Sequence, residues 1–124
     1  MCLYLKQNSQ LYTASIDITV YKFLTNTGAG LVSPYYNYPV KIGETYTSDL
    51  IKVYSNSDGF CCNVGIHSYK KKVDAEKMSY INNRFQNIIV KCIIPKGARY
   101  FKGLHVGEVS YASDTLTYVE IYEL

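Results

Sequence analysis

The fold is decided by one apolar run and the turn that ends it, Ile88-Ile89-Val90-Lys91-Cys92-Ile93-Ile94-Pro95-Lys96-Gly97. The run from Ile88 to Ile94 is mostly β-branched, which predicts a strand buried on most of both faces. Proline removes a backbone donor and glycine admits a positive φ, so the Pro95-Lys96-Gly97 segment predicts a turn. The stretch therefore predicts a central core strand followed by a sharp change of chain direction.

Length and composition predict a single folded domain over residues 1–124. The chain is 48% hydrophobic and 19% charged, a balance typical of a globular protein and not of a disordered one. It contains 14 tyrosines and no tryptophan. Tyrosine is common on half-buried strands, so a β-rich protein explains this content. A face that stacks bases or peptides is the functional alternative.

Charge and cysteine spacing exclude several classes of site. The net charge of +3 is too small to indicate nucleic-acid binding. The cysteines form no CxxC pair, and neither His67 nor His105 completes a zinc-ligand spacing, so we predict no metal and no cofactor. We expect no signal peptide and no membrane segment, and hence a reducing, cytoplasmic setting without membrane partners.

The remaining pattern predicts a mixture of strands and one helix. Alternating residues favour strands at Ile16–Leu24 and Leu116–Tyr122. A stretch of about residues 70–83 lacks glycine and proline and carries an imperfect helical stripe, which predicts the main helix. We therefore expect an α+β fold with a small mixed or antiparallel sheet.

In order along the chain, four segments resemble ADP-ribosyltransferase-like folds. They are Thr19-Val20-Tyr21-Lys22, Gly65-Ile66-His67-Ser68-Tyr69 with the following helix, Ile93-Ile94-Pro95-Lys96-Gly97-Ala98, and Glu108-Val109-Ser110-Tyr111-Ala112-Ser113-Asp114. The chain also resembles small proteins of gut Bacteroidales and their phages, which share a Met-Cys start, a Gly-x-His-Ser-x segment and an Ile-Pro-Lys-Gly turn.

The first resemblance implies an ADP-ribosyltransferase-like fold and a set of site residues. Lys22 stands where the family has a catalytic Arg or His, and His67 and Tyr69 stand in the middle motif. Asp114 is nearest to the catalytic glutamate position, with Glu108 six residues earlier. A carboxylate shortened by one methylene misplaces its charge by about 1 Å, enough to lose orders of magnitude in rate. The resemblance thus implies binding without turnover, and these five residues are the catalytic set if the protein is active.

The proposed ligand contacts add an aromatic loop to this set. Tyr35, Tyr36 and Tyr38 lie between two prolines, and their rings are expected at the rim of a cleft with Lys22, His67 and Tyr69.

Three functions stay open at this point. The first is a non-catalytic module that binds a nucleotide-like small molecule or a host protein, such as a phage (viral) accessory protein that evades host defence. The second is an active ADP-ribosyltransferase or NAD-cleaving enzyme. The third is a tyrosine-rich structural or assembly protein, which leaves homo-oligomerisation open.

Overall fold

Strands dominate the computed structural model, which describes residues 3–5, 10–33, 38–55, 59–81 and 86–122. The strands of the first half are β1 (Leu3–Leu5), β2 (Tyr12–Thr13), β3 (Ile18–Asn26), β4 (Leu31–Val32), β5 (Pro39–Val40), β6 (Thr45–Thr47) and β7 (Ile51–Ser55). The second half contains β8 (Gly59–Val64), β9 (Ile66–Tyr69), helix α1 (Lys72–Ile81), β10 (Gln86–Ile94), β11 (Arg99–His105), β12 (Glu108–Ser113) and β13 (Thr115–Tyr122).

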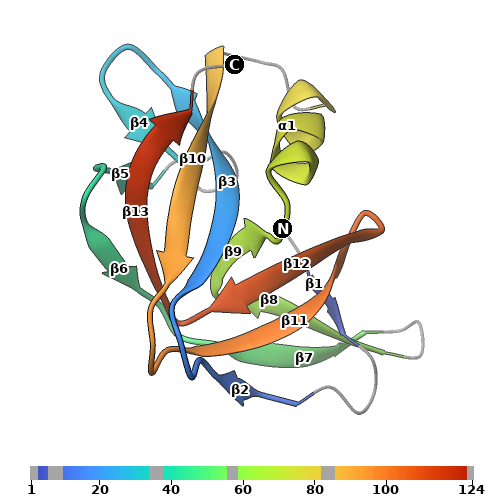
Figure 1. The fold of residues 1–124 in the computed structure, drawn as a ribbon. Coiled ribbons are helices and arrows are strands. Elements are labelled where there is room, and N and C mark those ends of the chain that lie inside the picture. The colour runs from blue at the N-terminus through green and yellow to red at the C-terminus, as the bar shows by residue number, and fades with distance from the viewer. Residues whose placement is uncertain (1–2, 6–9, 34–37, 56–58, 82–85, 123–124) are drawn as a thin grey trace.

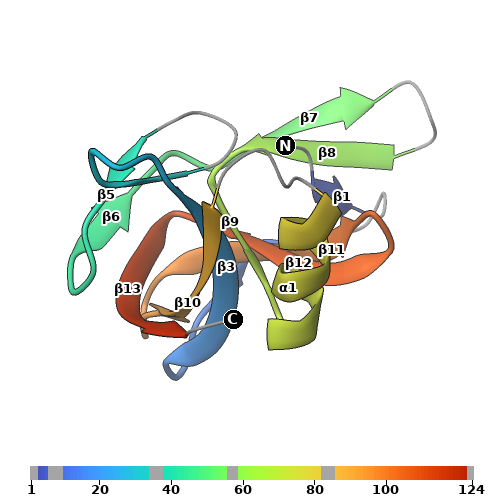
Figure 2. The ribbon, with the colours of Figure 1, turned by 90° about the horizontal axis from the view of Figure 1, so that it is seen from above.

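These strands form one sheet in which the described pairings are antiparallel. The main path runs β6-β13-β10-β3-β9-β12-β11-β1-β8-β7, while β2 pairs with β11 and β4 pairs with β3 and β5. In Figure 1, β13, β10 and β3 run upright, whereas β12, β11 and β7 run across the lower part. The sheet therefore turns a corner, and Figures 1 and 2 both place α1 on the opposite side of β3 from β5 and β6.

The α+β prediction is wrong, because the structure is a β-rich fold with one short helix. The predicted helix is present at Lys72–Ile81, so it begins two residues later than the predicted stretch of about 70–83, whose last two residues lie outside the described residues. It buries Ala75 and Met78 against the sheet and leaves Val73 exposed. Several strands are only two to six residues long, and short strands give a weak alternation signal. The prediction from the sequence therefore overestimated the contribution of the helix to the fold.

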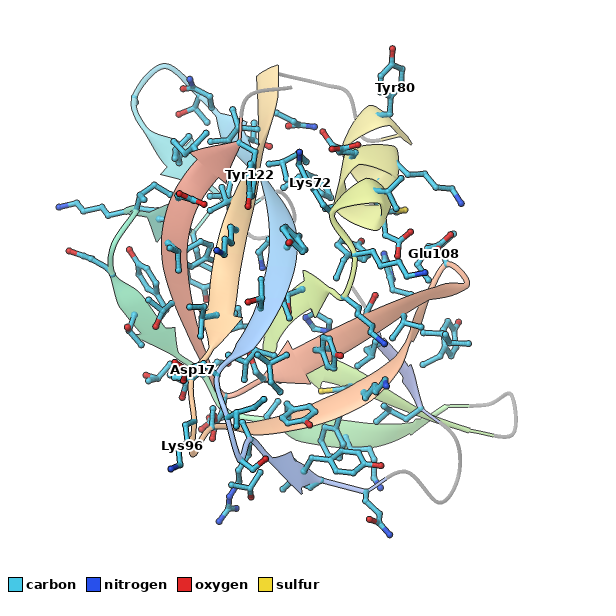
Figure 3. The ribbon with its side chains drawn as sticks, viewed as in Figure 1. Asp17, Lys72, Tyr80, Lys96, Glu108 and Tyr122 are labelled. Carbon is cyan, nitrogen blue, oxygen red and sulfur yellow. The ribbon has the colours of Figure 1, made fainter. Side chains whose placement is uncertain are left out.

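The central strand β10 and its closing turn are confirmed. β10 pairs with β3 along its whole length and with β13 on its other side. Val90, Cys92 and Ile94 are fully buried. In the turn that follows, Gly97 has φ 92° and the Ala98 amide donates to the Pro95 carbonyl. The Lys96 amide also donates to Asp17 Oδ1 at 2.8 Å, and Figure 3 shows these two residues at the lower edge of the sheet.

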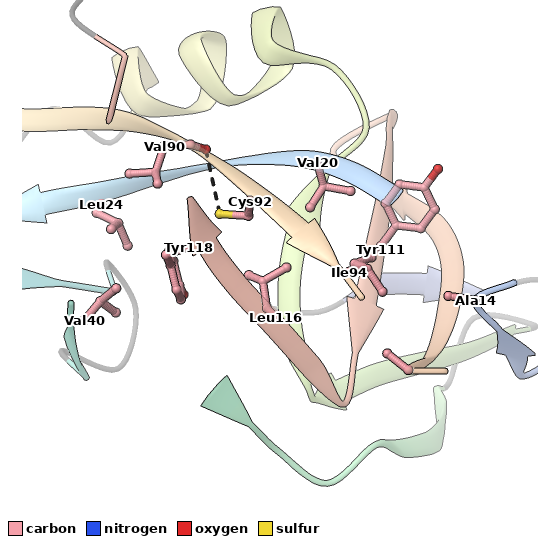
Figure 4. Packing of buried hydrophobic residues seen from close by; sticks show 11 residues of the cluster. Ala14, Val20, Leu24, Val40, Val90, Cys92, Ile94, Tyr111, Leu116 and Tyr118 are labelled. Carbon is pink, nitrogen blue, oxygen red and sulfur yellow. Dashed lines mark hydrogen bonds between the residues drawn. The ribbon is translucent and has the colours of Figure 1, made fainter. Parts of the chain in front are cut away.

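Apolar side chains gather in three clusters, on both faces of the sheet. The largest, which we call the interior cluster, lies among β3, β10, β12 and β13 (Figure 4). Its buried members are Ala14, Val20, Leu24, Val40, Val90, Cys92, Ile94, Ala98, Tyr111, Leu116 and Tyr118. The helix cluster lies beneath α1 and contains Phe23, Tyr69, Ala75, Met78 and Ile89. The N-terminal cluster contains Leu3, Leu5, Cys62, Phe101 and Ala112. Strand β9 thus contributes to two clusters: Ile66 packs against the interior cluster, and Tyr69 belongs to the helix cluster.

The hairpin between β11 and β12 holds a valine in a conformation that favours glycine or asparagine. His105 pairs with Glu108, which leaves Val106 and Gly107 as a two-residue loop. Their φ values are 51° and 82°. Positive φ at both loop positions is the type I′ geometry, for which Asn-Gly is the preferred sequence. A β-branched residue with positive φ is strained, and Val106 is 61% exposed, so it gains little packing in return.

We therefore expect Val106→Asn to stabilise the protein by about 1 kcal/mol, because it relieves this strain without removing a buried contact. Urea denaturation of the variant and the wild type measures the difference. Gly107→Ala is the matched change in the opposite direction, since alanine tolerates positive φ poorly. A lower unfolding free energy for Val106→Asn would show that Val106 contributes packing that outweighs its strain.

Candidate functional site

Lys22 reaches from β3 across to β9 inside the curved sheet. Its neighbours at two residues on either side, Val20 and Leu24, belong to the interior cluster, so Lys22 shares their face of the strand. Its Nζ donates a hydrogen bond of 2.9 Å to the backbone carbonyl of His67. Two of the site residues expected from the sequence, 45 positions apart, are therefore in direct contact.

Burial controls the acidity of this amine. It lowers the pKa of Lys22 to about 8, because an ammonium loses its hydration inside the protein. The nearby Cys92 thiol opposes this shift, although burial raises its own pKa to about 12. Lys22 is therefore a weakly basic amine beside a thiol that stays protonated.

The imidazole of His67 is buried and serves a backbone contact. Its Nε2 lies 3.0 Å from the Cys62 carbonyl, so in the neutral ring this nitrogen carries the proton and donates it. The pKa of His67 is lowered to about 4, mainly by burial, and the positive charge of Lys22 contributes to this shift. The ring is therefore uncharged near neutral pH and ties β9 to β8.

Ser68 and Tyr69 point to opposite faces of β9, as successive strand residues do. Tyr69 is buried in the helix cluster, with its ring centroid 5.9 Å from that of His105. Ser68 is fully buried, and its Oγ has no hydrogen-bond partner among the described residues. Tyr69 is therefore a packed core residue, and Ser68 is a buried polar group of the same motif that was not among the predicted site residues.

The two candidate carboxylates lie near opposite ends of β12 and bond to other groups. Glu108 begins the strand, and its Oε1 is 2.8 Å from Lys77 Nζ. Asp114 follows the strand and accepts hydrogen bonds from the Arg99 amide and the Thr115 hydroxyl, both 3.0 Å long. At about 3.3 Å per strand residue these carboxylates are on the order of 20 Å apart. The structure does not bring Glu108 and Asp114 together.

Glu108 belongs instead to a charged cluster at the start of α1, on the right of Figure 3. The Lys77 ammonium lowers the pKa of Glu108, and Asp74 contributes a hydrogen bond in the same direction. Burial raises the pKa of Asp74, and the adjacent Glu108 raises it further. This cluster fastens the helix to the β11–β12 hairpin.

The aromatic loop is described only in part. Tyr35 and Tyr36 lie outside the described residues. Tyr38 is exposed just before β5, and its amide donates to Ser33 Oγ at 3.2 Å. Its placement at the rim of a ligand cleft stays a prediction.

A further surface was not singled out from the sequence. We call it the tyrosine face and define it by Tyr4, Tyr12, Tyr100, Lys102 and Leu104. Tyr12 pairs with Tyr100 across β2 and β11, and their rings stack with centroids 5.5 Å apart and planes at 24°. Tyr4 pairs with Leu104 across β1 and β11. The alternation of Tyr100, Lys102 and Leu104 along one strand was the signal that could have identified it.

The tyrosine face is open to solvent at most of its positions. Tyr4 is 57% exposed, Tyr12 45% and Leu104 46%, and Lys102 is also exposed. Tyr100 is partly buried because it also packs edge-on against Tyr111, with centroids 5.6 Å apart at 77°. The stacked rings are therefore supported from the core beneath them.

No family model, curated protein or solved structure matches this chain. The resemblances to ADP-ribosyltransferase-like folds and to the Bacteroidales and phage proteins stay predictions from sequence motifs. Within the described ranges, no helix has the length and apolarity needed to cross a membrane, and no cluster of metal-ligating side chains occurs.

Proposed function

We propose that this chain is a non-catalytic binding module that contacts a protein partner through its tyrosine face. The observation that carries the proposal is the continuous strip of exposed tyrosine and leucine on β1, β2 and β11, with two rings already stacked. Tyrosine offers large contact area at a small cost in conformational entropy, and aromatic residues are enriched in the cores of protein interfaces. A supported, pre-stacked pair reduces that cost further.

The chemistry of the face favours a protein over a nucleic acid. Its described strand positions hold one exposed cation, Lys102, among apolar and aromatic groups. Nucleic-acid affinity comes largely from several lysine or arginine contacts to phosphates, and one such group supplies little of it. A partner segment with apolar side chains and a carboxylate opposite Lys102 is the best complement.

The contacts of the expected site residues support binding without chemistry. The Lys22 amine bonds to a backbone carbonyl, and the His67 ring does the same. The Asp114 carboxylate accepts from a backbone amide and a neighbouring hydroxyl. These three groups of the enzyme hypothesis thus each make a contact that supports the fold.

The test uses the purified protein to capture partners from a lysate of its native source. It compares variants on the tyrosine face with a variant on the exposed side of α1. We expect the wild type to retain a protein partner, and the triple change Tyr4→Ser, Tyr12→Ser, Leu104→Ser to weaken the purified complex by about 100-fold, since tyrosine contacts of this kind often contribute 1 to 2 kcal/mol each. Titration calorimetry with the purified partner measures this. All three side chains are at least 45% exposed, so folding should be unaffected.

Tyr80→Ser is the matched control, because Tyr80 is 85% exposed on α1 and points away from the sheet (Figure 3). It should leave the affinity unchanged. Two outcomes would overturn the proposal: a partner lost equally from the Tyr80 variant, or retained material that is nuclease-sensitive. Release of NAD-derived products by the wild type would support the enzyme alternative.

A further inference from the structure

A partly buried amine, on Lys22, and a fully buried hydroxyl, on Ser68, face the inside of the curved sheet at one place. Lys22 lies between Val20 and Leu24 on the interior face of β3. Ser68 pairs with Tyr111 across β9 and β12, and Tyr111 belongs to the interior cluster. The Lys22 Nζ bonds to the carbonyl of His67, the residue directly before Ser68. The amine and the hydroxyl therefore converge within the same interior.

The hydrogen bonds of these two groups are incomplete. A lysine ammonium has three donors, and Lys22 uses one of them, on the His67 carbonyl, in the described structure. Ser68 is 0% exposed, and its hydroxyl has no described partner. Buried donors are normally satisfied. A buried donor without a partner has lost the hydrogen bond that it makes with water in the unfolded chain, and this loss costs free energy.

The charge of Lys22 also lacks a counter-charge among the described residues. The described ion pairs are Lys72 with Glu76 and Lys77 with Glu108. The titratable groups that face or adjoin the amine are His67 on β9, Cys92 on β10, Tyr111 on β12 and Tyr118 on β13. Burial raises the pKa of Cys92, Tyr111 and Tyr118 and lowers that of His67, so all four are neutral near pH 7. A partly buried cation whose described neighbours are all neutral is stabilised when an anion joins it.

We propose that Lys22 Nζ and Ser68 Oγ bind a small monovalent anion of halide size. Such an ion accepts from both donors and neutralises the ammonium. The surrounding described side chains are apolar, as with Val20, or carry one neutral donor, as with Cys92 and Tyr111, so they supply no second positive charge for a larger, multiply charged oxyanion. This site is independent of the tyrosine face.

The test is a thermal unfolding series with sodium chloride against sodium gluconate, whose anion is too large for the site, at about 200 mM to keep screening equal. At about pH 7 we expect chloride to raise the wild-type melting temperature by about 3 °C or more relative to gluconate. The difference should shrink above about pH 9, where the amine loses its proton. Chloride NMR line broadening provides a direct measure of binding.

Lys22→Met should abolish both the chloride shift and the line broadening, and Ser68→Ala should weaken them. Lys41→Met, at an exposed position, is the matched control and should change neither. Equal melting temperatures in chloride and gluconate for the wild type would overturn the proposal and indicate that water satisfies the two donors. If Lys22→Met fails to fold, Ser68→Ala and the pH series decide the question, and a chloride shift that they leave unchanged would also overturn it.

Discussion

Gly103→Ala is expected to destabilise the protein by about 3 kcal/mol, because the added methyl group has no space. Gly103 lies in the middle of β11, where β1 approaches most closely. A Cβ at this position would overlap the backbone oxygen of Tyr4 and press against the side chains of Leu3 and Leu5. The obstructing atom is part of a strand, so relief requires β1 to move away from β11. That movement would open the N-terminal cluster, in which Leu3 is fully buried.

Urea denaturation measures this loss, and amide hydrogen exchange shows where it acts. We expect lost protection in β1 and β8, which depend on this contact, with β3 and β10 unchanged. Lys102→Ala is the neighbouring control and should change stability by no more than about 0.5 kcal/mol, since Lys102 is exposed. A Gly103→Ala protein with wild-type stability would mean that β1 can shift without cost.

The elements that the sequence predicted well are those with long, strongly apolar or alternating patterns. The β10 run forms a long strand paired on both sides, and the alternating strand near the C-terminus, β13, is its direct neighbour. The pairing of β9 with β12, or of β1 with β8, joins residues far apart in the chain, and no local pattern specifies such partners. The β-rich class was missed for that reason: the short strands become stable only through neighbours that the sequence does not name.

Among the described candidate site residues, Lys22 and His67 are the two from distant segments that the structure brings into contact. The contact of Lys22 with His67 uses a carbonyl, which no side-chain motif can reveal. Ser68 lies in the segment that resembles the family's middle motif, but it was not among the predicted site residues. Glu108 and Asp114 are far apart because the residues between them form the extended strand β12. The resemblance had implied a loop in this segment, which could have brought the two carboxylates closer together.

The buried imidazole of His67 predicts that the protein loses stability in mild acid. The pKa of His67 is about 4 in the folded protein and 6.5 in its ordinary state. Below pH 6.5 the unfolded chain therefore binds a proton that the folded protein does not, and stability falls as the pH drops. The contribution is fully present above pH 6.5 and is lost progressively down to about pH 4. A pKa difference of about 2.5 units corresponds to about 3 kcal/mol.

His67→Gln isolates this contribution from the carboxylates that titrate in the same range, such as Asp74 and Glu108. Glutamine cannot take up the proton, while its amide can still donate to the Cys62 carbonyl that His67 contacts. Urea denaturation at a series of pH values should show the wild type losing about 3 kcal/mol more than the variant between pH 6.5 and 4. Because the carboxylates are common to both proteins, the difference between the two curves reports His67 alone. Parallel curves would mean that His67 is protonated as readily in the folded protein as in the unfolded chain, and hence that water reaches the ring between β8 and β9.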